Sequence, residues 1–184
     1  PTFEPDRPAR RTPRPVPSTP EAARKVAVML LKHRSRTRKE LVDRLIDRGI
    51  DPALAAATFD ELERLGLTGD RRYAEETVRL ELSRRPASDE FLEHRLTSRG
   101  IADPLAEREV RRQTAEQGEL DRALELARRT LPRLLARDDA KRRAKLFGVL
   151  ARRGFDADTA ARAVEAVLGA NQNDDHTGAN HDEP

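Results

Sequence analysis

The sequence predicts an all-α protein built from three tandem three-helix repeats. Leu-x-x-Arg-Gly, followed by Ile or Phe and then Asp, occurs three times, at residues 45–51, 96–103 (with one inserted residue) and 150–156. The glycines Gly49, Gly100 and Gly154 are 51 and 54 residues apart. A period of this length is typical of stacked helical arrays. A glycine placed there closes a helix in the left-handed conformation, and no alternating apolar run indicates a strand.

The first repeat is expected over residues 21–69. Thr37 and Glu40 fit a capping box that opens its second helix, and Asp51, followed by proline, is expected to cap the third. Apolar residues at helical spacing mark the inward faces. They are Val26, Met29, Leu30, Leu41, Val42, Leu45, Ile46, Leu54, Phe59, Leu62 and Leu65.

The second repeat is expected over residues 70–118. Its first helix begins near Asp70 and is broken at Pro86, and Ser88 or Asp89 caps the next one. The third helix of this repeat is unusually polar. The expected inward residues are Tyr73, Ala74, Thr77, Val78, Leu80, Phe91, Leu92, Leu96, Leu105, Ala106 and Val110.

The third repeat is expected over residues 119–169. Pro132 ends or kinks its first helix, because proline lacks the amide donor that a helix interior needs. Asp156 caps its last helix. The expected inward residues are Leu120, Leu124, Ala127, Leu131, Leu146, Phe147, Leu150, Ala160, Val164, Val167 and Leu168.

Both ends of the chain are expected to be disordered. Residues 1–20 are rich in proline and arginine, and residues 170–184 are polar and acidic. Such segments bury too little apolar surface to offset the entropy of ordering. His176 and His181 are flanked by acids in the second tail, and a solvated tail is favoured over a metal site.

The composition argues against an enzyme and against a bound cofactor or metal. The chain has no cysteine, which excludes thiol catalysis and cysteine-ligated metals. Phosphate-binding glycine loops are absent, and the four histidines lack ligand spacing. Most carboxylates have arginine neighbours three or four residues away, as in exposed helical ion pairs. No apolar run approaches the roughly 20 residues that span a bilayer, and no signal peptide opens the chain, so we expect a soluble cytoplasmic protein.

Basic residues gather in four clusters, and arginine predominates in them. The clusters are Arg34, Arg36, Arg38 and Lys39; Arg71 and Arg72; Arg128, Arg129, Arg133 and Arg137; and Lys141, Arg142, Arg143 and Lys145 with Arg152 and Arg153. Arginine binds carboxylate or phosphate bidentately. Basic residues at a helix start interact unfavourably with the helix dipole. Their presence at 141–145 therefore suggests that a binding partner requires them. The first cluster is equally well explained as a solvated helix surface.

The partner could be DNA phosphate or an acidic protein groove. Aromatic platforms for stacking single-stranded bases are nearly absent, with Tyr73 the only tyrosine. A helix-turn-helix reading is disfavoured because the helices after each Arg-Gly turn begin with residues that read bases poorly.

Three stretches resemble the RecX family of bacterial RecA-regulating proteins: KHRSRTRKELVDRLIDRGID, FDELERLGLTGDRRYAEETV and KRRAKLFGVLARRGFDADTAARAV. The resemblance runs from about Glu21 to Leu168. Residues 84–88, RRPAS, depart from the family's aromatic turn. The resemblance implies an elongated, curved right-handed array of three repeats, acting as a monomer.

The resemblance also implies a non-enzymatic regulator that binds in the groove of the RecA–DNA filament and inhibits its ATPase, recombinase and coprotease activities in DNA repair and the SOS response. Charge clustering gives the expected contacts with RecA or DNA phosphate: Arg71, Arg72, Arg128, Arg129, Lys141, Arg142, Arg143, Arg152 and Arg153. The alternatives are a nonspecific DNA-binding repeat protein acting without RecA, and a helical scaffold for another acidic protein.

Overall fold

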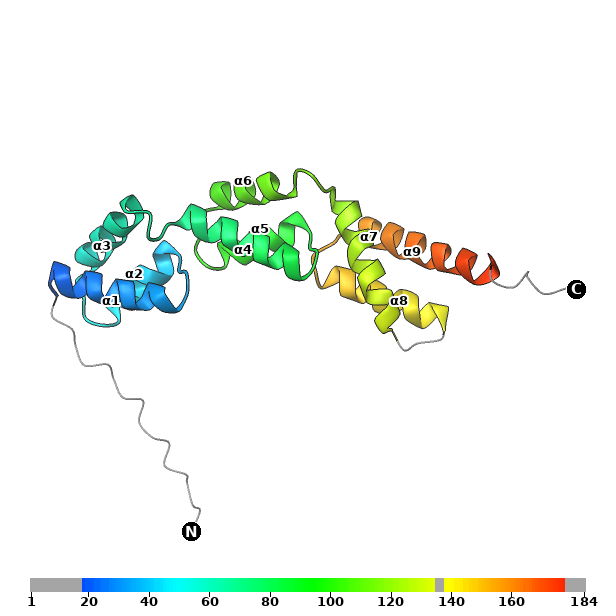
Figure 1. The fold of residues 1–184 in the computed structure, drawn as a ribbon, viewed down its shortest axis with the longest axis horizontal. Coiled ribbons are helices and arrows are strands. Elements are labelled where there is room, and N and C mark those ends of the chain that lie inside the picture. The colour runs from blue at the N-terminus through cyan, green and yellow to red at the C-terminus, as the bar shows by residue number, and fades with distance from the viewer. Residues whose placement is uncertain (1–17, 135–137, 178–184) are drawn as a thin grey trace, which may run out of the picture. The chain divides into compact units, whose positions relative to one another are not determined.

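The computed structural model describes residues 18–134 and 138–177, with the side chains of residues 171–177 outside the description. Within these ranges the regular structure is entirely helical, with nine α-helices and one short 3-10 helix (Figure 1). The all-α prediction is therefore confirmed. The chain divides into two compact units, Pro1–Gly69 and Asp70–Pro184.

The first unit contains α1 (Pro20–His33), α2 (Arg38–Ile46) and α3 (Pro52–Arg64). Its core combines small alanines on α1 and α3 with larger leucines and Phe59. The buried members are Ala23, Val26, Ala27, Leu30, Leu41, Leu45, Ile50, Ala55, Phe59 and Leu62. The alanines let the helices approach closely, and the larger residues fill the space between them.

The second unit begins with the second repeat: α4 (Asp70–Arg84), α5 (Asp89–Thr97) and α6 (Asp103–Thr114). Helix α6 packs against both α4 and α5. This repeat has a core of its own, made of Ala74, Val78, Ala87, Leu92, Leu96, Ile101, Ala106 and Val110. Although α6 is polar, Ala106 and Val110 suffice to bury one of its faces.

The third repeat completes the second unit with α7 (Glu119–Thr130), the 3-10 helix η1 (Leu131–Arg133), α8 (Asp139–Ala151) and α9 (Ala157–Thr177). Helix α7 ends just before Pro132, as predicted. Helices α7 and α8 both pack against α9. A third core lies here, which includes Ala123, Leu126, Leu146, Leu150, Phe155, Ala160, Val164 and Leu168.

The same helix ending recurs in all three repeats. Gly49, Gly100 and Gly154 have φ of 86°, 88° and 82°. The residue after each glycine donates its amide back to a leucine carbonyl of the preceding helix: Ile50 to Leu45, Ile101 to Leu96 and Phe155 to Leu150. That apolar residue is buried each time. The repeated Arg-Gly-Ile/Phe motif is thus a helix C-cap whose last residue enters the core.

The caps predicted at helix starts are present. Thr37 accepts from the Glu40 amide at 3.1 Å, Ser88 from Phe91 at 3.0 Å and Asp156 from Thr159 at 2.9 Å. Helix α6 instead has Ala102 as its N-cap, without a side-chain bond. The residue inserted after Gly100 places Asp103 inside the helix instead of before it.

Replacing Thr37 with alanine is expected to lower the free energy of unfolding by about 1 kcal/mol. The Thr37 side chain is fully buried, and its hydroxyl accepts an amide that has no helical partner. Thr37→Ser should restore most of the loss because it keeps the acceptor. Urea unfolding followed by circular dichroism measures both, and a Ser variant as unstable as the Ala variant would contradict the cap.

Some apolar residues predicted to face inward are exposed. Met29 is 48% exposed, Leu65 64% and Leu80 50%. Met29 lies beside the buried stripe that Ala23, Ala27 and Leu30 define, and Leu65 follows the last residue of α3. Ile46 and Phe147 are also exposed, at 38% and 37%.

The predicted tails differ from the structure at their inner ends. Ser18 accepts from the Asp51 amide at 2.9 Å and Thr19 caps α1, so these two residues belong to the first unit. Gly169 lies inside α9, which continues to Thr177. A single helical glycine costs only about 1 kcal/mol and does not stop a helix. Residues 1–17 and 178–184 of the predicted tails lie outside the described residues.

Candidate partner-binding surface

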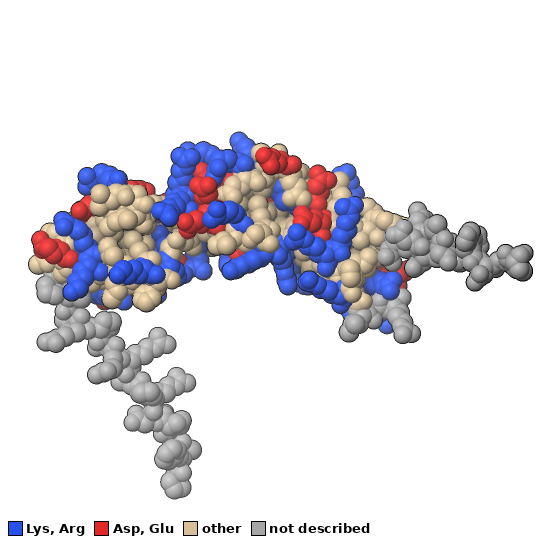
Figure 2. Space-filling model, in the orientation of Figure 1, with Lys and Arg blue, Asp and Glu red and all other residues tan. Residues whose placement is uncertain are grey.

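All nine residues predicted to contact a partner lie in the second unit, at four places. They occupy the first turn of α4, the last turn of α7, the first turn of α8 and the segment just after α8. Figure 2 shows Lys and Arg side chains over much of the visible surface of this unit, with small groups of Asp and Glu among them.

At the start of α4, both predicted arginines are exposed and already paired. Arg71 lies 3.5 Å from Glu109 of α6, and Arg72 lies 3.2 Å from Glu76 one turn along α4. Glu109 is buried and is also bound by Arg112 at 3.0 Å. This hydrogen bond raises the pKa of the Arg112 guanidinium from its ordinary value.

At the end of α7, Arg128 and Arg129 are both exposed. Arg129 forms an ion pair with Glu125 one turn earlier. No ion pair joins Arg128 to another described residue. Cations in the last turn of a helix are stabilised by its dipole, so these two arginines suit their positions without a partner.

At the start of α8, Asp138 caps the helix by accepting from the Ala140 amide at 2.8 Å. Arg142 pairs with Asp139 at 3.3 Å, and Arg143 pairs with Glu165 of α9. Lys141 is exposed. Acidic residues at the cap and first helical position therefore offset part of the unfavourable dipole interaction predicted for this basic run.

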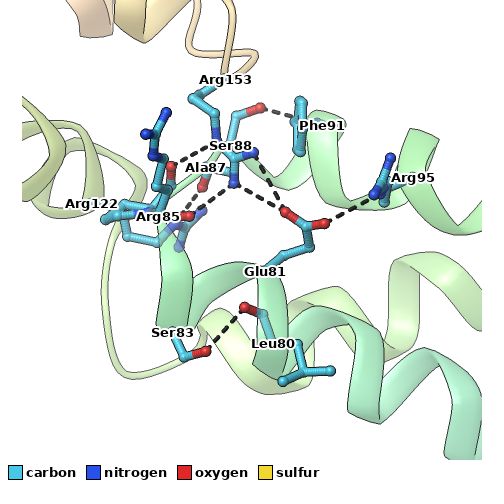
Figure 3. A network of polar contacts seen from close by, with 11 residues as sticks. Leu80, Glu81, Ser83, Arg85, Ala87, Ser88, Phe91, Arg95, Arg122 and Arg153 are labelled. Atoms are coloured by element: carbon cyan, nitrogen blue, oxygen red, sulfur yellow. Dashed lines mark hydrogen bonds and ion pairs between the residues drawn. The ribbon is translucent and has the colours of Figure 1, made fainter.

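Arg153, after α8, is largely covered by residues of the second repeat. Its side chain is 15% exposed, and it donates to the carbonyls of Arg85 at 2.8 Å and Pro86 at 3.2 Å (Figure 3). Its guanidinium carbon lies 4.1 Å from the centre of the Phe91 ring, and its terminal nitrogens lie 3.5 Å from Glu81. Burial lowers the pKa of this guanidinium from its ordinary value, and Glu81 opposes that shift. Arg152, by contrast, is exposed.

A second buried arginine, Arg122 on α7, was not singled out from the sequence. It is 2% exposed and donates to the Ala87 carbonyl at 2.9 Å, to the Gln117 carbonyl at 2.6 Å and to Asp89 at 2.6 Å. The sequence places it among charged residues of an amphipathic helix. The only local signal is its position beside Ala123, on the face that carries the buried stripe.

Arg122 and Arg153 together join the third repeat to the second. They bind the carbonyls of residues 85–87, the turn between α4 and α5 (Figure 3). The Ser88 amide adds a bond back to the Arg153 carbonyl at 3.1 Å. The segment of residues 84–88, RRPAS, therefore forms the second repeat's side of this joint.

The structure also brings together arginines that the sequence places apart. Arg84 and Arg85 at the end of α4 line one cavity with Arg129 and with Arg133 of η1. Only Arg129 belongs to the nine predicted contact residues. The Arg-Arg pair before Pro86 was the available sequence signal for Arg84 and Arg85, and Arg133 already belonged to one of the basic clusters.

Other site chemistry is not evident in the described part of the chain. Among those residues, no three His, Cys, Asp or Glu side chains gather where they could hold a metal ion. None of the helices searched there is both long and apolar enough to cross a membrane. Fold and surface together define a helical-repeat protein with an arginine-rich exterior.

Comparison with known proteins shows the family to which this chain belongs. Residues 23–62 match the family model described as RecX, first three-helix domain, and residues 117–164 match RecX, third three-helix domain. Regulatory protein RecX of Mycobacterium avium (strain 104) is 36% identical over 155 residues, covering 84% of this chain and 89% of the relative. That of Chlorobium phaeobacteroides (strain BS1) is 28% identical over 143 residues, covering 78% and 91%. The chain belongs to the RecX family.

Solved structures show the same fold. The crystal structure of RecX from Lactobacillus salivarius has a TM-score of 0.67 and 22% identity, covering 81% of this chain and 96% of that one. A second crystal structure, of a regulatory protein RecX, has a TM-score of 0.64 and 18% identity, covering 82% and 73%.

Proposed function

We propose that the protein is a non-enzymatic regulator that binds in the groove of the RecA–DNA filament and inhibits its ATPase, recombinase and coprotease activities. In this proposal it acts as a cytoplasmic monomer in DNA repair and the SOS response. Membership of the RecX family carries the proposal, because relatives that match most of this chain are named regulatory proteins.

The exposed arginines of the second unit supply the proposed contacts. Most of their carboxylate partners within the chain are themselves surface groups, as in the pairs of Arg72 with Glu76 and Arg143 with Glu165. Exposed pairs of this kind contribute only about 0–1 kcal/mol. An acidic protein surface or a row of phosphates can therefore replace them at little cost, with bidentate guanidinium contacts.

Arg153 has a different role in this proposal. Its donors are engaged by Arg85, Pro86 and Glu81, so we assign it to holding the second and third repeats in a fixed relation. The proposed contact set is then Arg71, Arg72, Arg128, Arg129, Lys141, Arg142, Arg143 and Arg152. A rigid joint keeps these cations at fixed spacing, which lowers the entropic cost of binding an extended partner.

Adding the protein to RecA assembled on single-stranded DNA is expected to lower the rate of ATP hydrolysis at stoichiometric amounts. The double variant Arg142→Glu, Arg143→Glu should need at least about tenfold more protein for the same inhibition, since each charge-assisted contact contributes roughly 1.5–3 kcal/mol. The matched control is Lys25→Glu, Lys32→Glu, which changes the net charge equally at exposed positions of the first unit.

Unchanged ATPase with the wild-type protein would overturn the proposal. Equal weakening by both double variants would show that only net charge matters. Binding to DNA alone, with a log–log salt slope of about −0.9 per neutralised phosphate and no dependence on RecA, would support the nonspecific DNA-binding alternative instead.

A further inference from the structure

A cavity of about 520 Å³ lies within the second unit, where the end of α4 meets the third repeat. Four arginines line it: Arg84 and Arg85 from the end of α4 and the residue after it, Arg129 from α7, and Arg133 from η1. Pockets that hold small molecules in proteins have volumes of roughly 300–1,000 Å³. The cavity is therefore of the size that suits a small ligand.

Side chains in the described part of the chain do not neutralise the charge of this cavity. Of its four guanidinium groups, Arg129 pairs with Glu125, and the other three make no ion pair with any described residue. The carboxylates of Glu81 and Asp89 pair with arginines outside the cavity lining. Glu81 pairs with Arg95 and Arg153, and Asp89 pairs with Arg122.

Helix dipoles do not cancel this charge. The C-terminal ends of α4 and α7 each bring about half a negative charge to the cavity. With the Glu125 carboxylate, they offset about two of the four positive charges. About two remain, which is the charge that a small polyanion would match.

The walls of the cavity are fixed in relation to one another. Arg153 ties the carbonyls of Arg85 and Pro86 to the third repeat, at 2.8 and 3.2 Å (Figure 3), and Arg122 ties Ala87 at 2.9 Å. The backbone that carries two of the lining arginines thus cannot move away from the third repeat without breaking these three hydrogen bonds, of which the one from Arg122 is buried. A preorganised site loses less conformational entropy when a ligand binds.

Apolar side chains complete the lining. Pro86, Leu126 and Val149 contribute the uncharged part of the surface, which suits the body of a ligand whose charged groups contact the arginines. The guanidinium fork matches the geometry of phosphate oxygens, and four forks can serve more than one phosphate group. A concave site with an apolar part favours a small molecule over a continuous nucleic-acid backbone, which is usually followed by an open groove.

We propose that this cavity binds a small molecule carrying two or more phosphate groups, of the class of nucleoside di- and triphosphates. The site shares Arg129 with the contacts proposed for RecA, but its ligand binds without RecA. It lies beside the joint between the second and third repeats, so occupancy also links these repeats through the ligand.

Titration calorimetry of the full-length protein tests the proposal, with sodium tripolyphosphate and adenosine triphosphate as probes at about 0.1 M salt. We expect one molecule to bind per chain, with adenosine triphosphate the tighter because of the apolar lining. The double variant Arg84→Glu, Arg133→Glu should weaken both at least about tenfold, since two charge-assisted contacts are lost. The matched control Arg108→Glu, Arg162→Glu carries the same charge change at exposed sites outside the cavity, and should stay within about twofold because salt screens distant charges.

Several outcomes would overturn the proposal. One is the absence of binding at millimolar tripolyphosphate, and another is equal weakening in both double variants. A third has two parts: the wild type binds a single-stranded oligonucleotide but neither small probe, and the cavity variant loses the affinity for the oligonucleotide. That result would reassign the arginines to nucleic-acid binding. Circular dichroism checks that each variant is folded. Because the titrations contain no RecA, a negative result does not bear on the proposed regulation of RecA.

Discussion

The variant Arg122→Leu is expected to lower the free energy of unfolding of the second unit by about 3 kcal/mol. The guanidinium is 2% exposed and serves three acceptors, of which the carbonyls of Ala87 and Gln117 belong to the backbone. Leucine replaces only the aliphatic stem of the arginine and leaves these acceptors without a donor, and each buried unsatisfied group costs about 1–3 kcal/mol. The third acceptor, Asp89, is 42% exposed and can be hydrated, so the expected loss comes from the two carbonyls.

Urea unfolding of the full-length chain measures the loss, and hydrogen exchange on peptides from α5 and α7 locates it. Arg122→Lys should recover only part of the stability, because one ammonium group cannot reach three acceptors in the geometry of the guanidinium fork. The matched control is Arg128→Leu on the exposed side of the same helix, expected within about 0.5 kcal/mol of wild type. An Arg122→Leu variant as stable as this control would show that the joint does not depend on the buried arginine.

Replacing Gly154 with alanine is expected to destabilise the same unit by about 3 kcal/mol or more. Two costs add. At φ of 82° a side chain strains the backbone, by about 1–2 kcal/mol. An added Cβ would also lie 2.4 Å from the Ser88 hydroxyl oxygen and 2.8 Å from the Phe91 Cβ, so the two repeats would have to separate at their joint.

Gly66→Ala separates these two costs. Gly66 has φ of 68°, but an added Cβ there meets nothing within 4 Å. This variant should therefore show only the backbone strain, about 1–2 kcal/mol. Thermal unfolding of the two variants side by side measures the difference. Equal destabilisation would mean that the close approach of Gly154 to the second repeat contributes nothing to stability.

Local features of the fold could be predicted because each depends on a few neighbouring residues. Gly49, Gly100 and Gly154 end helices in the left-handed conformation, as their place in the motif indicated. Thr37 and Asp156 cap helices because their side chains reach amides only three residues away. Helical spacing identified most of the buried stripes, but it misplaced Met29 and Leu80 at the stripe edges, where burial depends on whether a neighbouring helix reaches that far.

The arginine-rich surface was predictable only in part. Charge clustering found Arg128 and Arg143, which are exposed. It could not distinguish them from Arg153, whose side chain is 15% exposed, because all three occur in similar runs of charged residues. The difference is made by contacts with Glu81 and Pro86, which lie 72 and 67 residues away along the chain.

The sequence by itself determined that this protein consists of three alike helical modules, where most of their helices begin or end, and that it resembles the RecX family. Periodicity, caps and glycines act over a few residues, so a linear pattern encodes them. Only the tertiary structure decided which arginines are buried in the joint and which ones meet around a cavity. Those arrangements depend on which turn of one repeat lies against the next, and this is set by packing between residues that are distant in the chain.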